Sequence, residues 1–308
     1  MQTACILSMA FILILNIFVL TTALVRFSFL DVLHPVALFF HQSCLNFSPP
    51  NVISSQELNA LVCGQDFLSL ADSQIYIVSG LIHLFVVSGS HLVLIERTLS
   101  KLANKFYASS GLTHLILLIY ILVCNLNPPI VRSYLFIVVL ALSKKYFLHI
   151  KNHNALLAAS LIGLILEPQW IMSLSYQMSW IAGLTLIYID EIYKKSHLLI
   201  KNFLFYLHFY LTMLFLGLPQ IVTVIISTVL SPVLEYVLFP LAFLVFLWTD
   251  LSVLFDFLIQ ILKLSLNQFE LNAFVRNFDA YQVVMINWIL IFGLHFFIHI
   301  RKITRVVL

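Results

Sequence analysis

Long apolar runs constrain this chain more than any other feature. The first occupies residues 4–25, and others follow at roughly 74–95, 108–125, 130–143, 154–167, 170–189, 203–230, 233–249, 251–266 and 282–300. A transmembrane helix needs about 20 apolar residues, whereas the strands of a membrane barrel are shorter and alternate in polarity. The runs therefore predict an all-α fold, a polytopic transmembrane helical bundle of about ten spans that includes short or broken helices.

The composition excludes the two main alternatives to a membrane protein. Hydrophobic residues make up 62% of the chain and charged residues only 9%, whereas a soluble domain carries about 25% charged residues. A soluble enzyme is excluded, because so few charges cannot cover a surface that faces water. Disorder is excluded as well, because 27 Phe, 12 Tyr and 4 Trp are too many for a solvated coil.

The basic residues predict the orientation of the spans. Twelve of the 16 Lys and Arg residues form four clusters: Arg97/Lys101/Lys105, Lys144/Lys145/Lys151, Lys194/Lys195/Lys201 and Arg301/Lys302/Arg305. An even number of spans separates neighbouring clusters if 203–230 is one helix kinked at Pro219. Basic loops face the cytoplasm, so the sequence predicts a multi-pass membrane protein with both termini cytoplasmic.

The same orientation predicts three parts of the chain. Residues 1–30 form an N-terminal transmembrane anchor, and 31–73 form a short extracytoplasmic segment that contains acidic residues and no Lys or Arg. Residues 74–308 form the main membrane domain. The outward segment contains Cys44 and Cys63, and two alternatives stay open there: a disulfide in an oxidising compartment, or two free thiols.

Polar residues concentrate in 79–91, within an otherwise apolar run. At about 100° per residue, His83, Ser90 and His91 fall on one face with Ser79 and Gly80. That face either lines a polar path or packs tightly on another helix with its histidines hydrogen-bonded. A break at Ser88-Gly89-Ser90 would divide this face, although broken helices are usual at transport sites.

Arg132 follows Pro128 and Pro129 at the start of a predicted span. A cation near a helix N-terminus opposes the helix dipole, so we expect either an anion or carboxylate partner, or an extended side chain that reaches the outer interface. In the span 170–189, Gln177 and Ser179 are further candidates, with interhelical hydrogen bonding as the alternative.

Two more features have weaker chemical implications. Lys263 is expected to pair with Glu270 or Asp256, and such pairs are usually structural. His295 and His299 have a metal-capable spacing but no evident third ligand. Motifs for phosphate loops, zinc proteases and serine hydrolases are absent. We therefore predict no enzymatic activity, no metal and no cofactor.

Several segments occur in the order typical of a known family. These are Cys63-Gly64-Gln65, the run Gly80 to His91, Pro129-Ile130-Val131-Arg132-Ser133, Asn154 to Pro168, Tyr176-Gln177-Met178-Ser179-Trp180, and Leu230-Ser231-Pro232 to Pro240. Together they resemble the membrane domain of the ComEC-type competence family. Glu235 departs from the family pattern, which usually has Asn there.

This resemblance implies a channel component of the inner cell membrane that passes single-stranded transforming DNA into the cytoplasm during natural competence. It implies a separate outer DNA receptor and a cytoplasmic ATPase or helicase as partners, the lipid bilayer as surroundings, and it is compatible with a homo-oligomer. On this view the channel-lining candidates are His83, Ser88, Gly89, Ser90, His91, Arg132, Gln177 and Ser179. The alternatives are a small-anion transporter or channel, a membrane-embedded enzyme that uses His83 and His91, and a degenerate relative without transport.

Overall fold

The computed structural model describes residues 28–66, 73–85, 87–105, 110–148, 150–194, 196–215, 222–267 and 280–307. Every regular element in these ranges is helical, which confirms the predicted all-α class. The predicted anchor over 1–30 lies mostly outside the described residues, as do the side chains of His83 and His299.

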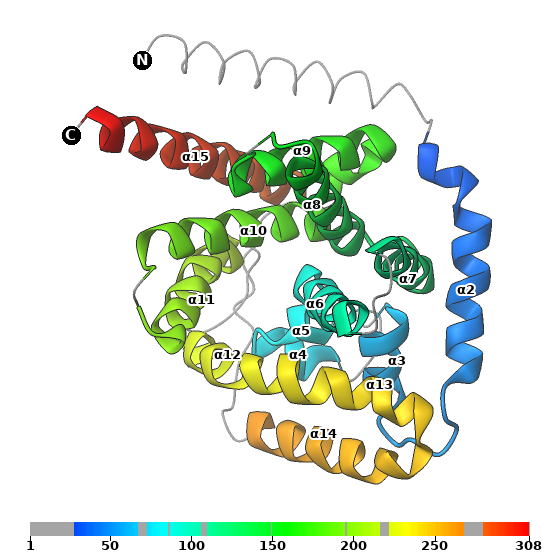
Figure 1. Cartoon of the computed structure of the whole chain (residues 1–308). Helices are drawn as coiled ribbons and strands as arrows, with labels where there is room; N and C mark the ends of the chain where they lie inside the picture. Colours follow the sequence, from blue (N-terminus) through cyan, green and yellow to red (C-terminus); the bar gives the residue numbers. More distant parts are fainter. Residues whose placement is uncertain are drawn as a thin grey trace.

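The helices are numbered along the chain in Figure 1. The first half contains η1 (Phe29–Val32), α2 (His34–Phe47), α3 (Ser55–Cys63), α4 (Ser73–Val78), α5 (Ile82–Phe85), α6 (Gly89–Lys105), α7 (Ser110–Val123), α8 (Pro128–Lys145) and α9 (Asn152–Leu166). The second half contains η2 (Pro168–Met172), α10 (Leu174–Ile192), α11 (Leu198–Phe215), α12 (Val222–Val233), η3 (Leu234–Leu238), α13 (Phe239–Leu247), η4 (Thr249–Leu251), α14 (Ser252–Asn267) and α15 (Ala280–Val307).

The predicted span 74–95 is three short helices. A turn at Ser79 and Gly80 separates α4 from α5, and a second break before Gly89 precedes α6. Gly80 has φ of +73°, a left-handed conformation that glycine adopts without steric cost. The prediction of one continuous polar face over 79–91 is therefore wrong, because the two breaks interrupt the helical periodicity on which that face depends.

The predicted boundary between spans 203–230 and 233–249 is also wrong. Residues Val222–Leu247 form one continuous helix of 26 residues, in which η3 is a π-helical turn. Pro232 and Pro240 lie on either side of η3. Proline removes a backbone donor without necessarily ending a helix in a membrane protein, since local π turns rearrange the hydrogen bonds around it.

Val222–Leu247 is the one helix within the described ranges that is long and apolar enough to cross a membrane by itself. Shorter apolar helices cover Gly111–Val123, Asn152–Leu166 and Gln282–Ile298. Many large apolar side chains lie exposed, including Val253, Leu247 and Ile289. Faces of this kind are typical of proteins that contact lipid or partners.

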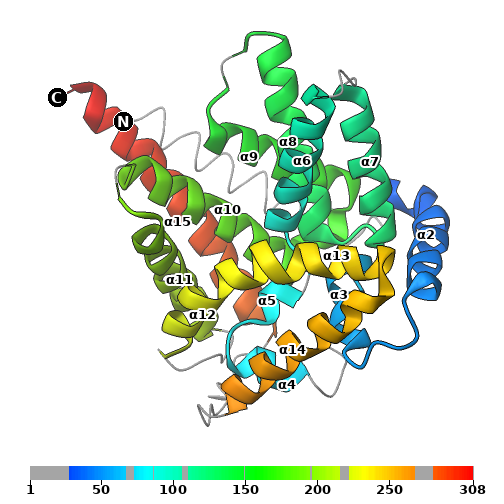
Figure 2. The same ribbon diagram turned by 60° about the horizontal axis from the view of Figure 1, so that its bottom comes forward.

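Two buried clusters of apolar side chains hold the helices together. The first joins α2, α6, α7, α8, α9, α10 and α15, and includes Trp180, Trp288 and Ile130. The second joins α3, α4, α5, α12, α13 and α14. Ile95 of α6 and Phe243 of α13 pack against both clusters. In Figure 1, α6 lies between α8 and α13, and in Figure 2 it lies beside α8 with one end close to α13, so α6 stands where the clusters meet.

Candidate functional site

The first turn of α6 contacts the first turns of α8 closely. A Cβ atom on Gly89 would lie 2.0 Å from the hydroxyl oxygen of Ser133 and 3.8 Å from Nη2 of Arg132. Only glycine leaves room for this approach. We call Gly89, Arg132, Ser133 and Ser179 the Arg132 site.

Arg132 lies inside the protein, with 6% of its surface exposed. Its Nε and Nη2 atoms both donate to Oγ of Ser179 on α10, at 3.0 and 2.8 Å, and Nη2 also donates to Oγ of Ser133 at 3.3 Å. Ser133 donates its own proton to the carbonyl of Pro129 at 2.8 Å. The guanidinium edge formed by Nε and Nη2 usually donates to two oxygens of a carboxylate or phosphate. Here both atoms donate to one hydroxyl oxygen, that of Ser179.

Among the residues that the structure describes, no carboxylate compensates the charge of Arg132. No Asp or Glu oxygen lies within 4.0 Å of its guanidinium in the part of the chain that the structure describes. Of the two predicted partners, the carboxylate is thus not found there. Because a buried charge without a counter-charge is costly, an anion that reaches this site would be stabilised.

Ser88, Ser90 and Glu235 form a chain of hydrogen bonds on the other side of the same helix break. Oγ of Ser90 donates to Oε1 of Glu235 at 2.9 Å, and lies 2.7 Å from Oγ of Ser88. We call these three residues the hydroxyl relay. In the sequence alone, Glu235 stands out only as a departure from a family pattern. Its position four residues after Ser231 and eight after Ser227, on one polar face of a helix, is the signal that identifies it.

His91 packs inside the protein beside this chain. Its ring stacks on Phe239 of α13, with centroids 4.0 Å apart, and its Nδ1 accepts a hydrogen bond from the backbone N–H of Ser88 at 3.3 Å. His91 therefore supports the start of α6 through its contacts.

Gln177 lies away from the Arg132 site, although only two residues separate it from Ser179. It is fully buried, its Nε2 donates to the carbonyl of Ile171 at 2.8 Å, and its Oε1 accepts from Asn287 of α15 at 3.2 Å. Two residues turn an α-helix by about 200°, so Ser179 faces α8 and Gln177 faces α15.

His295 is engaged in this same part of the molecule. Nε1 of Trp180 donates to its Nε2 at 3.1 Å. No group of three or more His, Cys, Asp or Glu residues with metal-binding geometry occurs among the residues that the structure describes.

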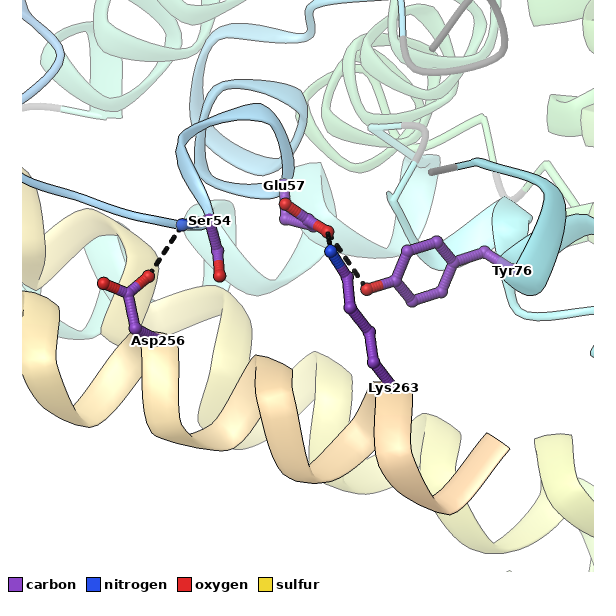
Figure 3. A network of polar contacts seen from close by, with 5 residues as sticks. All are labelled: Ser54, Glu57, Tyr76, Asp256 and Lys263. Carbon is purple, nitrogen blue, oxygen red and sulfur yellow. Dashed lines mark hydrogen bonds and ion pairs between the residues drawn. The ribbon is translucent and has the colours of Figure 1, made fainter. Parts of the chain in front are cut away.

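A second buried charge lies far from Arg132 along the chain. Glu57 of α3 is 2% exposed, and its Oε1 lies 2.7 Å from Nζ of Lys263 on α14 and accepts from the hydroxyl of Tyr76 at 3.2 Å (Figure 3). Lys263 thus contacts Glu57 and not the expected Asp256. Glu270 lies outside the described residues.

Asp256 has a different role on α14. Its carboxylate accepts the backbone N–H of Ile53 at 3.0 Å and that of Ser54 at 2.8 Å, just before α3 begins. The disulfide between Cys44 and Cys63 joins the opposite end of α3 to α2, with the two Cα atoms 5.8 Å apart. Both ends of α3 are therefore anchored.

Comparison with known proteins identifies one family. Its model, described as Competence protein, matches residues 61–301 of the chain. This range contains the Arg132 site and the hydroxyl relay, whereas Cys44 and Glu57 precede it. No curated protein and no solved structure matches the chain.

Proposed function

The chain belongs to the Competence protein family, and we propose that it is the inner-membrane channel component that passes single-stranded DNA into the cytoplasm. The family match confirms the resemblance seen in the sequence, and it indicates a membrane protein that takes part in competence and DNA uptake. The channel itself is our proposal.

The observation that carries this proposal is Arg132. A single strand carries a negative charge at each phosphate, so it needs cationic and hydrogen-bonding groups to pass a membrane of low dielectric. Arg132 is a buried cation without a carboxylate partner in the described chain, beside a helix break that exposes Ser90. A passing phosphate would supply the missing negative charge for a short time.

The other candidate residues have separate roles in this proposal. Ser179 and Ser133 orient the guanidinium, and Gly89 allows α6 to approach it. Ser88 and Ser90 present hydroxyls at the break, while His91 and Gln177 position α6 and α10 through buried contacts. His83 is retained as a lining candidate on sequence grounds alone.

The proposed setting follows from the predicted topology. Residues 31–73 would face outward and 74–308 would form the channel domain, in a multi-pass arrangement with both termini in the cytoplasm. Because the chain contains no phosphate-loop motif, pulling of the strand is assigned to a cytoplasmic ATPase or helicase. DNA capture is assigned to an outer receptor. The domain limits, the number of spans and a homo-oligomer are parts of the same proposal.

The direct test replaces Arg132 in a competent host that has this gene as its only copy. We expect Arg132→Gln to reduce the uptake of labelled DNA into the cytoplasm roughly tenfold, equivalent to about 1.4 kcal/mol, and Arg132→Lys to retain part of the activity. Lys201→Gln is the matched control, since Lys201 pairs with Asp190 at the surface.

Protein level and thermal stability in detergent are measured for each variant, so that misfolding is separated from loss of transport. Full uptake by Arg132→Gln at normal protein level would contradict the proposal. Unchanged transformation after deletion of the gene would favour a degenerate relative instead.

A small-anion transporter is the second candidate, because an unpaired buried arginine also suits chloride or inorganic phosphate. Flux measurements in proteoliposomes separate the two. Anion flux that depends on Arg132, together with unchanged DNA uptake in the Arg132→Gln strain, would favour the transporter.

A further inference from the structure

Glu235 is the only charged residue in the helix Val222–Leu247. It lies in the π-helical turn η3 and is half-buried. No Lys, Arg or His nitrogen lies within 4.0 Å of its carboxylate in the described ranges. An ionisable residue in such a helix is costly and is usually functional, and proton relays are one established use of such residues.

The hydrogen bonds of Glu235 have a defined direction. Each serine hydroxyl has one proton to donate. When Glu235 is ionised, its carboxylate can only accept, so Ser90 donates to Oε1 of Glu235 and Ser88 is left as the donor in the contact of 2.7 Å between the two hydroxyls. Both hydroxyls then point toward the carboxylate.

A proton on Glu235 would reverse this direction. The protonated carboxyl then donates to Ser90, Ser90 donates to Ser88, and the proton of Ser88 is freed for another acceptor. One O–H bond of a hydronium ion in the solvent breaks as one O–H bond forms at Glu235, and the two serine hydroxyls change direction by rotation alone. Ser90 is exposed, which gives that proton a route to the carboxyl.

The relay ends at the helix break beside the Arg132 site. Ser88 and Ser90 flank Gly89, which contacts Ser133. Glu235 therefore contacts Ser90, and Arg132 lies next to Gly89, the preceding residue of the same turn. A change of hydrogen bonding at Ser88 occurs where α6 meets α8.

The neighbouring titratable groups are few. His91 follows Ser90 on α6 and stacks on Phe239, one turn beyond Glu235. Tyr206 on α11 is near enough to interact with the charge of Glu235. Arg132 on α8 lies across Gly89. None of the three forms an ion pair with Glu235.

We propose that Glu235, with Ser90 and Ser88, forms a proton-binding site that sets the hydrogen bonding of the break before α6. A metal ion suits this arrangement less well, because Ca²⁺ and similar hard cations need six or more surrounding oxygens. The relay supplies one carboxylate and two hydroxyls in a row.

Infrared spectroscopy of the purified full chain in lipid nanodiscs tests the proposal across a pH series. We expect the protonated-carboxyl C=O region to contain one component, here called the band, that grows as pH falls and disappears in Glu235→Gln. Glu96→Gln is the matched control, because Glu96 also accepts a hydrogen bond of 2.9 Å from a serine, Ser100, and lies on α6 away from the break. We expect Glu96→Gln to retain the band.

A second variant keeps the test informative if Glu235→Gln does not fold. We expect Ser90→Ala to move the midpoint of the band to higher pH, since the lost hydroxyl stabilises the ionised carboxylate. A band that persists in Glu235→Gln, that does not move in Ser90→Ala, or that responds to Na⁺ and not to pH would overturn the proposal. The readout involves no DNA, so its failure is distinct from failure of the proposed channel.

Discussion

Glu57 and Arg132 are both buried charges, yet the protein treats them in opposite ways. Glu57 has a lysine at 2.7 Å and a tyrosine hydroxyl at 3.2 Å. Among the described residues, Arg132 has the hydroxyls of Ser179 and Ser133 as its side-chain partners and no carboxylate. Glu57 belongs to the cluster around α3 and α14, and Arg132 to the cluster around α8 and α10. A compensated charge holds helices together, whereas an uncompensated one is available for a mobile anion.

The largest expected effect is the loss of the lysine from the compensated pair. Lys263→Met leaves Glu57 buried without a cation, and breaking a buried pair in this way costs about 3–5 kcal/mol. We expect unfolding of the purified protein at clearly lower temperature or denaturant concentration. The double variant Glu57→Gln with Lys263→Met should recover most of the loss.

The surface pair of Lys201 and Asp190 is the matched comparison, because Asp190 is largely exposed. Lys201→Met should cost about 0–1 kcal/mol. If Lys201→Met and Lys263→Met lower the free energy of unfolding equally, burial does not distinguish the two ion pairs.

The disulfide is expected to have the next largest effect. Cys44 and Cys63 are 19 residues apart, and closing a loop of that size stabilises a protein by about 3 kcal/mol. The double variant Cys44→Ser with Cys63→Ser should therefore unfold more easily, as should the wild type in reductant. Hydrogen exchange should rise in α3, near Glu57, and stay unchanged in α8. Exchange that rises equally in both would contradict the separation of the two regions.

An intermediate effect is expected at the contact between α6 and α8. Gly89→Ala places a methyl group 2.0 Å from Oγ of Ser133, and overpacking of this kind costs about 1–3 kcal/mol. We expect DNA uptake to fall together with the stability of the protein. Adding Ser133→Ala to the Gly89→Ala chain should restore part of the stability and part of the uptake. Gly293→Ala is the control, since no heavy atom of the described residues lies within 4 Å of a methyl group added there.

The smallest expected effect is the stabilisation of the protein by bound single-stranded DNA, which should depend on Arg132. A short single-stranded oligonucleotide at about ten times its dissociation constant stabilises a protein by about 1.4 kcal/mol. We expect this shift in thermal unfolding for the wild type and for Lys201→Met, but a smaller one for Arg132→Gln. Loss of one phosphate contact should also lower the slope of log affinity against log salt by about 0.7. Identical slopes would remove Arg132 from the binding surface.

Several features of the fold follow from local sequence alone. The helical class follows from apolar runs too long for strands, and α8 begins at Pro128 as its paired prolines predict. The family match includes the ordered motifs of the region 61–301. The disulfide between Cys44 and Cys63 is one of the two alternatives that the sequence left open.

Other features were outside the reach of sequence patterns. The apolar runs predicted one helix over 74–95 and a boundary inside Val222–Leu247, and both predictions were wrong. The apolar content of a segment does not show where its backbone breaks or continues. The difference between Gln177 and Ser179 depends on which neighbouring helix each side chain meets.

The sequence by itself determined that this chain is helical, apolar and a member of a competence family, since these properties depend on residue types and their order. The tertiary structure alone decided which charges are compensated. Glu57 and Lys263 are brought together from distant parts of the chain, while Arg132 is enclosed by hydroxyls and Glu235 meets a serine across a helix break. Such pairings depend on how the helices pack, because electrostatic energies are set by distances in space and by burial.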